Sequence, residues 1–237
     1  MARETIYMKQ LLLTKQPFME KQEKQKKVLK SDIKYAVQLN DEQKEAKRLI
    51  RENQIVVITG RAGCGKSLVS AQTALDFLFK KEYDNIFVTR ATVEVGHSLG
   101  FLPGSLNEKF NPYLEAFQEN LVKCYDKVKI EQLVLDGRIV AFPVQFIRGK
   151  TIDDVLVVEE AQNLTKAEML AILTRLGKGG RIIINGDNEQ KDIKDPFNGL
   201  SYVIELSKKI EEIKWIKLKT NHRSDIVGKI LDYEYGK

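Results

Sequence analysis

Cysteine is scarce in this sequence, with two residues among 237, and proline is rare, with five. Two cysteines cannot form a network of disulfides, which excludes a small disulfide-rich secreted scaffold and leads us to expect a reducing, cytoplasmic setting. No stretch approaches the roughly 18 apolar residues of a membrane-spanning helix, so we expect no membrane partner. The first residues also lack the small-residue cleavage site of a secretory signal peptide. A composition that is 43% hydrophobic and 30% charged predicts a globular protein.

Basic residues outnumber acidic residues mainly near the N-terminus. Residues 1–34 contain nine Lys or Arg and four Asp or Glu, whereas the whole chain contains 39 and 33, a net charge of +6. Most of the excess positive charge therefore lies in this segment. We interpret residues 1–36 as a basic N-terminal arm and residues 37–237 as one domain. Such an arm is either a solvated segment or a contact for a polyanion, because Lys and Arg bind phosphates.

Short apolar runs alternate with helical patterns through the rest of the chain. Four runs are continuous rather than alternating, at 54–60, 85–91, 154–161 and 180–187, and residues 213–219 are expected to form a last strand. Runs of this kind, with helices expected between them, predict a parallel sheet that is buried on both faces. We therefore predict a doubly wound α/β fold with a mostly parallel sheet and helices on both faces.

Residues 92–150 interrupt this alternation. We interpret them as an insertion in the same domain, since no Gly/Ser-rich linker marks a second one. A helix is expected from about Asn111, and residues 138–149 are expected to form a hairpin or a pair of edge strands.

The segment GRAGCGKS, Gly60 to Ser67, matches the phosphate-loop pattern G-x-x-x-x-G-K-[ST]. It follows a predicted strand and opens a predicted helix, which is the context that this motif requires. Lys66 is then expected to contact the β- and γ-phosphates of ATP, and Ser67 to bind Mg²⁺. The predicted nucleotide-binding residues of this loop are Gly60, Arg61, Ala62, Gly63, Cys64, Gly65, Lys66, Ser67 and Leu68. Cys64 is either a small residue that fills the loop or a thiol activated by the helix N-terminus.

Two acidic residues, Glu159 and Glu160, end the apolar run VLVV. Ligands bind outside the carboxyl ends of strands in open α/β sheets, so both carboxylates are expected beside the nucleotide. We assign Glu159, together with Ser67, to Mg²⁺, and Glu160 to polarising the attacking water. Aspartate is usual at the first position. Because glutamate is one methylene longer, we expect a working site with altered metal geometry.

Several blocks resemble, in chain order, the motifs of superfamily-one helicases: LNDEQKEA (39–46), GRAGCGKS, EEAQN, INGDNEQ (184–190) and LKTNHRS (218–224). A more specific resemblance is to PhoH-like proteins, through VTRATVEVGHSLGFLPGSLNEKFNPYL, FIRGKTIDDVLVVEEAQN and LTRLGKGGRIIINGDNEQKDI. It covers about residues 39–235, and the chain resembles the short single-domain forms, including those that phages encode, which would act in the host cytoplasm. The resemblance implies a RecA-like P-loop ATPase that uses ATP and Mg²⁺.

The resemblance also implies roles for single residues. Gln43 would read the adenine edge, Gln190 would sense the γ-phosphate, and Arg223 would reach the γ-phosphate as an arginine finger. His222 stands where the helicase motif usually has tyrosine. The residues expected to touch a nucleic-acid backbone, by comparison with helicases, are Thr89, Arg90, Thr92 and His97.

The resemblance and the basic arm together predict single-stranded RNA or DNA as a partner. Superfamily-one helicases clamp ATP between two RecA-like domains, and here one is expected. A neighbouring subunit would then supply the second wall, which predicts head-to-tail self-association. The resemblance suggests a hexameric ring, with Arg148 or Arg175 as the finger donated between subunits.

Three functions remain open from the sequence. The leading one is a Mg²⁺-dependent ATPase that binds single-stranded RNA or DNA and acts as an oligomeric helicase or remodelling motor. The second is an ATP-switched nucleic-acid-binding protein with little turnover, which the glutamate at position 159 favours. The third is a small-molecule P-loop kinase, which is disfavoured by a water-polarising Glu160 and by the lack of an Arg-rich lid pattern.

Overall fold

The computed structural model describes most of the predicted domain. The described residues are 33, 35–91, 106–190, 192, 197–222 and 224–234. Nearly all of the basic N-terminal arm lies outside them, and so do the candidate site residues Thr92, His97 and Arg223. None of the described helices is long and apolar enough to cross a bilayer.

The centre of the domain is a six-stranded sheet in the order β3-β2-β4-β5-β1-β6. All five strand pairings are parallel. The strands are β1 (Ile55–Thr59), β2 (Ile86–Arg90), β3 (Ile139–Ala141), β4 (Val155–Glu159), β5 (Arg181–Gly186) and β6 (Ile213–Lys217). The mostly parallel sheet predicted from the sequence is confirmed.

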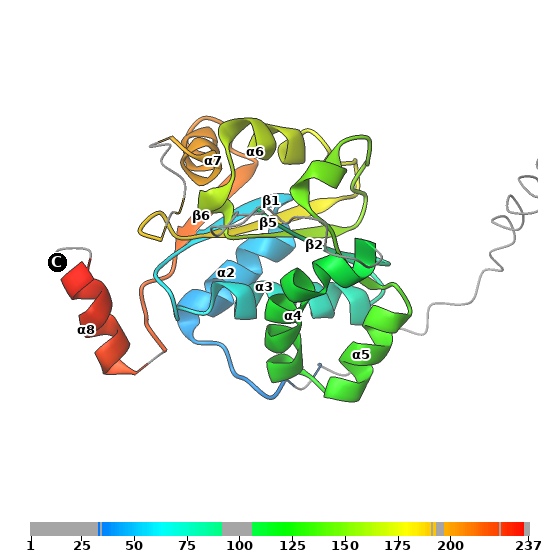
Figure 1. Ribbon diagram of the computed structural model, residues 1–237, viewed down its shortest axis with the longest axis horizontal. Helices are drawn as coiled ribbons and strands as arrows, with labels where there is room; N and C mark the ends of the chain where they lie inside the picture. Colours follow the sequence, from blue (N-terminus) through cyan, green and yellow to red (C-terminus); the bar gives the residue numbers. More distant parts are fainter. Residues whose placement is uncertain are drawn as a thin grey trace, which may run out of the picture. The chain divides into compact units, whose positions relative to one another are not determined.

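Helices cover both faces of this sheet (Figure 1). On one face lie α2 (Asp41–Glu52), α3 (Lys66–Phe79), α4 (Leu106–Cys124) and α5 (Lys127–Leu135), and on the other lie α6 (Lys166–Leu173) and α7 (Gly199–Ser207). A further helix, α8 (Asp225–Glu234), follows β6. The fold is therefore the predicted doubly wound α/β fold.

Burial along β4 explains why its sequence is continuously apolar. Val155 and Val157 belong to the core under α2–α5, whereas Leu156 and Val158 belong to the core under α6 and α7. All four residues are fully buried. Successive side chains of a strand point to opposite faces, so a strand covered on both sides needs an apolar residue at every position. The first position that ends this run, Glu159, lies at the carboxyl edge of the sheet.

The segment interpreted as an insertion is built into this layer. After β2 the chain forms α4 and α5 and returns as β3, which pairs in parallel with β2. The expected hairpin or pair of edge strands at 138–149 is wrong, because this segment forms a single edge strand followed by a 3-10 turn at Val144–Ile147. Pro143 precedes this turn, and proline lacks the N–H that a second strand would need for its ladder.

The helices α2, α5 and α8 were not recognised in the sequence, although the first two begin with a side-chain cap. Asn40 caps α2, and Gln43 completes a capping box with it. Asp126 caps α5 by accepting a hydrogen bond from the N–H of Lys129 at 2.9 Å. The capping residues are present in the sequence. Residues 39–46 were interpreted only as a helicase-like motif and residues 92–150 only as an insertion, so the caps were not used to predict helices.

Candidate active site

Glycines shape the loop between β1 and α3. Gly63 and Gly65 have φ angles of 88° and 87°, a region that favours glycine. A Cβ atom on Gly65 would lie 2.4 Å from the side-chain nitrogen of Gln43, so a larger residue would clash there. Gly65 is the N-cap of α3, and no side chain of the described residues caps this terminus. The first N–H groups of α3 are therefore available to an anion, and the helix dipole favours a phosphate.

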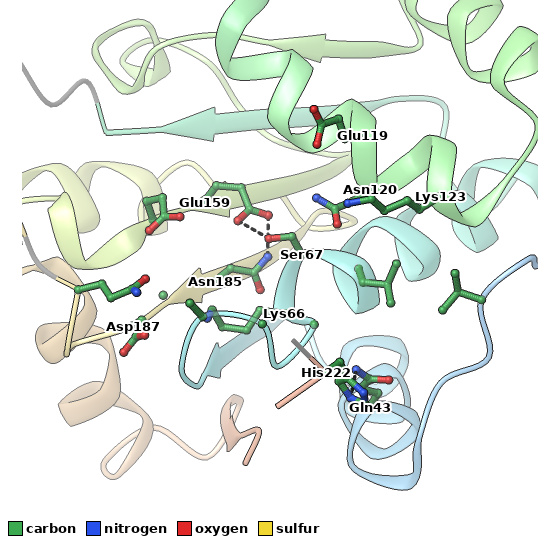
Figure 2. A pocket seen from close by; sticks show the side chains of 18 of the residues that line it. Gln43, Lys66, Ser67, Glu119, Asn120, Lys123, Glu159, Asn185, Asp187 and His222 are labelled. Carbon is green, nitrogen blue, oxygen red and sulfur yellow. Dashed lines mark hydrogen bonds between the residues drawn. The ribbon is translucent and has the colours of Figure 1, made fainter. Parts of the chain in front are cut away.

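Lys66 and Ser67 open α3 and line a cavity of about 670 Å³ (Figure 2). Lys66 Nζ donates a hydrogen bond to the carbonyl oxygen of Gly60 at 2.5 Å, which holds the ammonium over the loop. The predicted nucleotide-binding residues that line this cavity are Gln43, Ala62, Gly63, Gly65, Lys66, Ser67 and Leu68. The predicted phosphate-binding arrangement is thus assembled in one place.

Arg61 has a different role from its neighbours in the loop. Its guanidinium pairs with Glu189 at 2.7 Å and with Asp232 of α8 at 2.5 Å, and its side chain does not line the cavity. These two ion pairs connect the phosphate loop to the segment after β5 and to α8. In this arrangement the Arg61 side chain positions the loop, and nucleotide contact by this residue would come from its main chain.

Ser67 meets Glu159 at the carboxyl end of β4 (Figure 2). Ser67 Oγ donates to Glu159 Oε2 at 2.9 Å, and Asn185 Nδ2 donates to Oε1 at 2.8 Å. Ser70 Oγ donates to Asn185 Oδ1 at 3.0 Å, which orients that amide. Both carboxylate oxygens of Glu159 are therefore held at ordinary hydrogen-bond lengths.

This pair of groups fits Mg²⁺. Mg²⁺ takes few protein ligands at such sites, typically one or two oxygens, and completes its shell with water and phosphate. Accordingly, within the described ranges no three His, Cys, Asp or Glu side chains form a metal-binding group. Glu159 already reaches the hydroxyl of Ser67, so the additional methylene relative to aspartate is accommodated in the fold.

Burial raises the pKa of Glu159 from 4.5 to about 7. The negative charge of Glu160 adds to this effect, whereas the hydrogen bonds from Asn185 and Ser67 and the charge of Lys66 oppose it. Near neutral pH the ionised and protonated forms of Glu159 are therefore close in free energy. A bound cation would favour the ionised form, because its charge acts directly on the carboxylate.

Glu160 has an unusual backbone conformation. Its φ and ψ angles of 52° and 45° are left-handed, a region that costs a residue with a side chain roughly 1–3 kcal/mol. The side chain lines the cavity, and its Oε2 accepts a hydrogen bond from Gln162 Nε2 at 2.5 Å. Strained residues of this kind cluster at active sites. The turn after β4 therefore places a second carboxylate beside that of Glu159.

Gln162 was missed as a site residue, although it connects the others. Its side chain is fully buried, and its Nε2 donates to the main-chain oxygen of Gln190 at 3.1 Å as well as to Glu160. Its Oε1 accepts a hydrogen bond from the main-chain N–H of Asp187 at 2.9 Å. Gln190, the predicted γ-phosphate sensor, lines the same cavity. The place of Gln162 in the block EEAQN was the available signal.

Gln43 is held by protein contacts at the base of the cavity. Its side-chain oxygen accepts from the N–H of Asn40, and its Nε2 donates to the carbonyl oxygen of Cys64 at 3.1 Å and lies 3.2 Å from His222 Nε2. The N–H of His222 donates to the carbonyl oxygen of Gly63 at 3.0 Å. Gln43 is 2% exposed. Its contact with adenine stays a prediction, one that requires an exchange of these hydrogen bonds.

Helix α4 supplies a wall of the cavity that sequence reasoning did not identify. Glu119, Asn120 and Lys123 line it (Figure 2). Asn120 Nδ2 donates to the carbonyl oxygen of Ala116 at 3.0 Å. These residues come from the segment interpreted as an insertion, and only the return of the chain to β3 brings them opposite the phosphate loop.

The two cysteines are expected to react slowly with thiol reagents in the native protein. Cys64 is 2% exposed, and burial raises its pKa although the charge of Lys66 opposes this. Burial likewise raises the pKa of Cys124 to about 11. Both thiols should therefore be protonated and shielded at pH 8. Thiol titration with a chromogenic disulfide should give two rapid equivalents in denaturant and few in its absence. One rapid equivalent from native wild type that is lost in C64S would support the activated-thiol interpretation instead.

The structure describes only some of the residues predicted to contact nucleic acid, and both of the arginines predicted to act between subunits. Thr89 is 2% exposed, which speaks against a surface contact through its side chain, whereas Arg90 is half-buried and pairs in register with Glu159. Arg148 is exposed and Arg175 half-buried, and neither lines the cavity. The carbonyl oxygen of Arg175 accepts from the N–H of Ile152, just before β4 begins. Arg175 therefore lies toward the amino ends of the strands, away from the cavity.

The site can be compared with those of known proteins. The family model described as PhoH-like protein matches residues 36–234. A PhoH-like protein of Bacillus subtilis (strain 168) is 38% identical over 194 residues, which are 80% of this chain and 61% of that protein. Protein PhoH of Escherichia coli (strain K12) is 34% identical over 196 residues, 81% of this chain and 54% of that protein. The chain thus spans little more than half the length of these relatives.

Among solved structures, the large terminase of a thermophilic bacteriophage is similar in fold. It has a TM-score of 0.51 and 10% sequence identity, and the match covers 83% of this chain and 50% of the terminase chain. At this identity the likeness concerns the α/β architecture alone.

Proposed function

The chain belongs to the PhoH-like protein family, and we propose that it is a Mg²⁺-dependent ATPase that binds single-stranded RNA or DNA. The observation that carries the ATPase proposal is the hydrogen bond between Ser67 and Glu159 beside the phosphate loop, with Glu160 next in the chain. Phosphoryl transfer to water needs a held phosphate chain, a metal ligand and a group that orients the water. All three kinds of group line one cavity.

The described residues divide this work among themselves. Lys66 and the first N–H groups of α3 bind and orient the phosphates. Ser67 and Glu159 would hold Mg²⁺, which when bound neutralises charge on the phosphate oxygens. Glu160 accepts a proton from the attacking water, and Gln162 fixes the orientation of its carboxylate. Gln190 and Arg223, which is outside the described residues, stay proposed contacts of the γ-phosphate.

Two features support a nucleic-acid partner. The predicted arm at residues 1–36 carries most of the excess positive charge of the chain, and phosphate contacts by Lys and Arg are independent of base sequence. Arg90 ends β2 and pairs in register with Glu159 on β4. A strand held at Arg90 would therefore act on the same sheet edge that holds the metal-binding carboxylate. That proximity gives a physical reason for turnover to respond to a bound strand.

We also propose self-association in a head-to-tail manner, and a hexameric ring is the assembly to test first. Arg175 lies toward the amino ends of the strands, and the nucleotide cavity lies at their carboxyl ends. In a head-to-tail arrangement, the surface at the amino ends of the strands in one copy faces the nucleotide cavity of the next copy. Arg175, or the exposed Arg148, could then complete the charge stabilisation in the neighbouring site, and the assembly could act as a helicase or remodelling motor.

Sedimentation in the presence of ATP, Mg²⁺ and RNA tests the proposed self-association. A monomer under all conditions would contradict the proposed self-association.

Phosphate release from ATP is the experiment that tests the proposed activity. Purified protein should release phosphate only with Mg²⁺, and single-stranded RNA or DNA should raise the rate. K66A, which removes the cation from the phosphate loop, is the inactive reference. E205Q removes one charge from α7, outside the cavity, and should behave as wild type. Release that is equal in wild type and K66A would indicate a contaminating ATPase.

One observation favours a second candidate, an ATP-switched binding protein with little turnover. Glu159 is half-buried, has a raised pKa and is held by Ser67 and Asn185. If that network retains the proton, Mg²⁺ binds weakly, because the cation must displace that proton. Tight ATP binding without phosphate release, with or without nucleic acid, would favour this candidate over the motor.

A further inference from the structure

Asp187 lies at the carboxyl edge of the sheet, between the two segments that form the candidate active site. It follows β5, which pairs with β4 on one side and with β1 on the other. Glu159 and Glu160 come from the end of β4, and the phosphate loop follows β1. Asp187 therefore emerges between the acidic pair and the phosphate loop, at the edge where open α/β sheets bind ligands. Asp187 and Lys66 line the same cavity (Figure 2). Glu160 lines it as well.

The contacts of Asp187 use only one oxygen of its carboxylate. Its main-chain N–H donates to Gln162 Oε1 at 2.9 Å, and its Oδ1 accepts a hydrogen bond from the N–H of Glu189 at 3.0 Å. The residue is 6% exposed. Oδ2 is buried as well, and no donor in the described part of the chain forms a hydrogen bond with it. One oxygen thus holds the turn after β5, and the other is a buried acceptor without a partner, in a residue that lines the cavity.

A buried acceptor without a partner is unfavourable, and most such groups in folded proteins are satisfied. The surroundings of Asp187 increase that cost. Burial raises the pKa of its carboxyl, and the charges of Glu189 and Glu160 add to the effect, while the N–H of Glu189 and the ammonium of Lys66 oppose it. A turn that needed only Oδ1 could be made by serine or asparagine with less electrostatic cost. The second oxygen therefore requires an explanation beyond the turn.

We propose that Asp187 is a catalytic residue whose Oδ2 accepts a hydrogen bond from the water that attacks the γ-phosphate. The proposal rests on the ATPase function proposed above and adds a second acceptor to it. An attacking water must aim a lone pair at phosphorus, which leaves two O–H groups to be directed elsewhere. Glu160 lies on the β4 side of the cavity and can receive one of them. Asp187, on the neighbouring strand, can receive the other.

The step balances with these two groups. The water oxygen forms a bond to the γ-phosphorus as the bond from that phosphorus to the bridging oxygen of ADP breaks. One proton passes from the water to Glu160, which later releases it to solvent. The second hydrogen stays covalently bound and becomes the hydroxyl hydrogen of the phosphate product. Asp187 thus orients this hydrogen and does not itself remove a proton.

The test is D187N, because the fold predicts how asparagine will be oriented. The N–H of Glu189 requires an acceptor at the Oδ1 position, so the amide oxygen should take that place. The amide nitrogen then stands where Oδ2 stood and presents a donor in place of an acceptor. Loss of one hydrogen bond to the reacting water is expected to lower kcat about 10- to 100-fold. Binding of ATP should be unchanged or tighter, since one negative charge near the phosphates is removed.

Two further variants separate catalysis from folding. D187S keeps a short side chain that can accept from the N–H of Glu189 but removes the oxygen beside the cavity, and it should lose kcat as D187N does. D192N removes a carboxylate in the segment that also follows β5, where Asp192 accepts from Asn163 and does not line the cavity, and it should match wild type. Melting temperatures of all variants within a few degrees of wild type would show that the turn persists.

A second readout that does not depend on turnover is the trapping of ADP with Mg²⁺ and aluminium fluoride. Aluminium fluoride mimics the transferring phosphoryl group with its attacking water. Wild type should trap ADP, and D187N should trap it at least tenfold more weakly while binding ADP equally well. Equal kcat and equal trapping in wild type and D187N would overturn the role of Asp187 and leave the ATPase proposal intact. A loss of ADP binding in both variants would mean that Asp187 is structural. If wild type neither releases phosphate nor traps ADP, the ATPase proposal itself fails, and this proposal fails with it.

Discussion

Replacing Glu160 with glutamine is expected to lower kcat for ATP hydrolysis by about 10²–10⁴-fold, the usual contribution of a positioned general base. The backbone of Glu160 is left-handed, and its carboxylate lines the cavity next to the end of β4. Glutamine keeps the length of the side chain and can still accept the hydrogen bond from Gln162 through its oxygen. It cannot take a proton from water. Nucleotide affinity should therefore stay within a few fold of wild type.

The measurement combines phosphate release with equilibrium binding of a fluorescent ATP analogue. E205Q, the same change at a surface ion pair of α7, serves as the matched control. A variant that binds ATP and does not hydrolyse it would also hold any ATP-dependent assembly in one state, which helps the sedimentation experiment. If E160Q retained more than half of the wild-type rate, Glu160 would not be the base, and the nearby carboxylates of Glu159 and Asp187 would have to be tested in that role.

Much of this arrangement could be predicted because it depends on local sequence. The continuous apolar run before Glu159 follows from a strand that is covered on both faces, and β4 has that environment. The phosphate loop was predictable for a similar reason, since Gly63 and Gly65 adopt backbone conformations that few other residues adopt. Motifs of this kind carry their geometry in consecutive residues, so one sequence is enough to place them.

The remaining parts of the site depend on contacts between distant segments. Gln162 joins Glu160 to the chain after β5, and this contact arises only because β4 and β5 are neighbours in the sheet. Glu119 reaches the cavity because the chain between β2 and β3 crosses the sheet as α4 and α5. The free oxygen of Asp187 is likewise a property of packing. None of these contacts follows from periodicity, and the motif blocks that contain Gln162 and Asp187 do not specify which atoms those side chains meet.

The second large effect is expected from E159Q, and it concerns stability as well as activity. The pKa of Glu159 is about 7 in the folded protein against an ordinary 4.5, so the folded state binds this proton more tightly than the unfolded state. Its contribution to stability is full below pH 4.5 and is lost as pH rises through 7. At 1.36 kcal/mol for each unit, the ionised side chain lowers the free energy of unfolding by about 3 kcal/mol above pH 7.

E159Q removes this penalty, because glutamine stays neutral. Its oxygen can accept from Asn185, and its nitrogen can donate to the hydroxyl of Ser67, which is also able to accept. Urea unfolding without nucleotide or metal should give similar stabilities for E159Q and wild type at pH 5. At pH 8, E159Q should be more stable by up to about 3 kcal/mol. E131Q, a change at a 46% exposed glutamate of α5, controls for the loss of charge alone.

The same variant should lose Mg²⁺-dependent phosphate release, because a neutral amide is a poor ligand for a hard cation. A gain in stability together with a loss of turnover would show that the carboxylate of Glu159 serves metal binding although it destabilises the folded protein. It would also distinguish the two functions proposed for this chain. If wild type hydrolyses ATP and the rate rises between pH 6 and 8, ionisation of Glu159 gates a working ATPase. A stability difference between E159Q and wild type that does not change with pH would contradict the raised pKa, and with it the argument that the retained proton weakens Mg²⁺ binding.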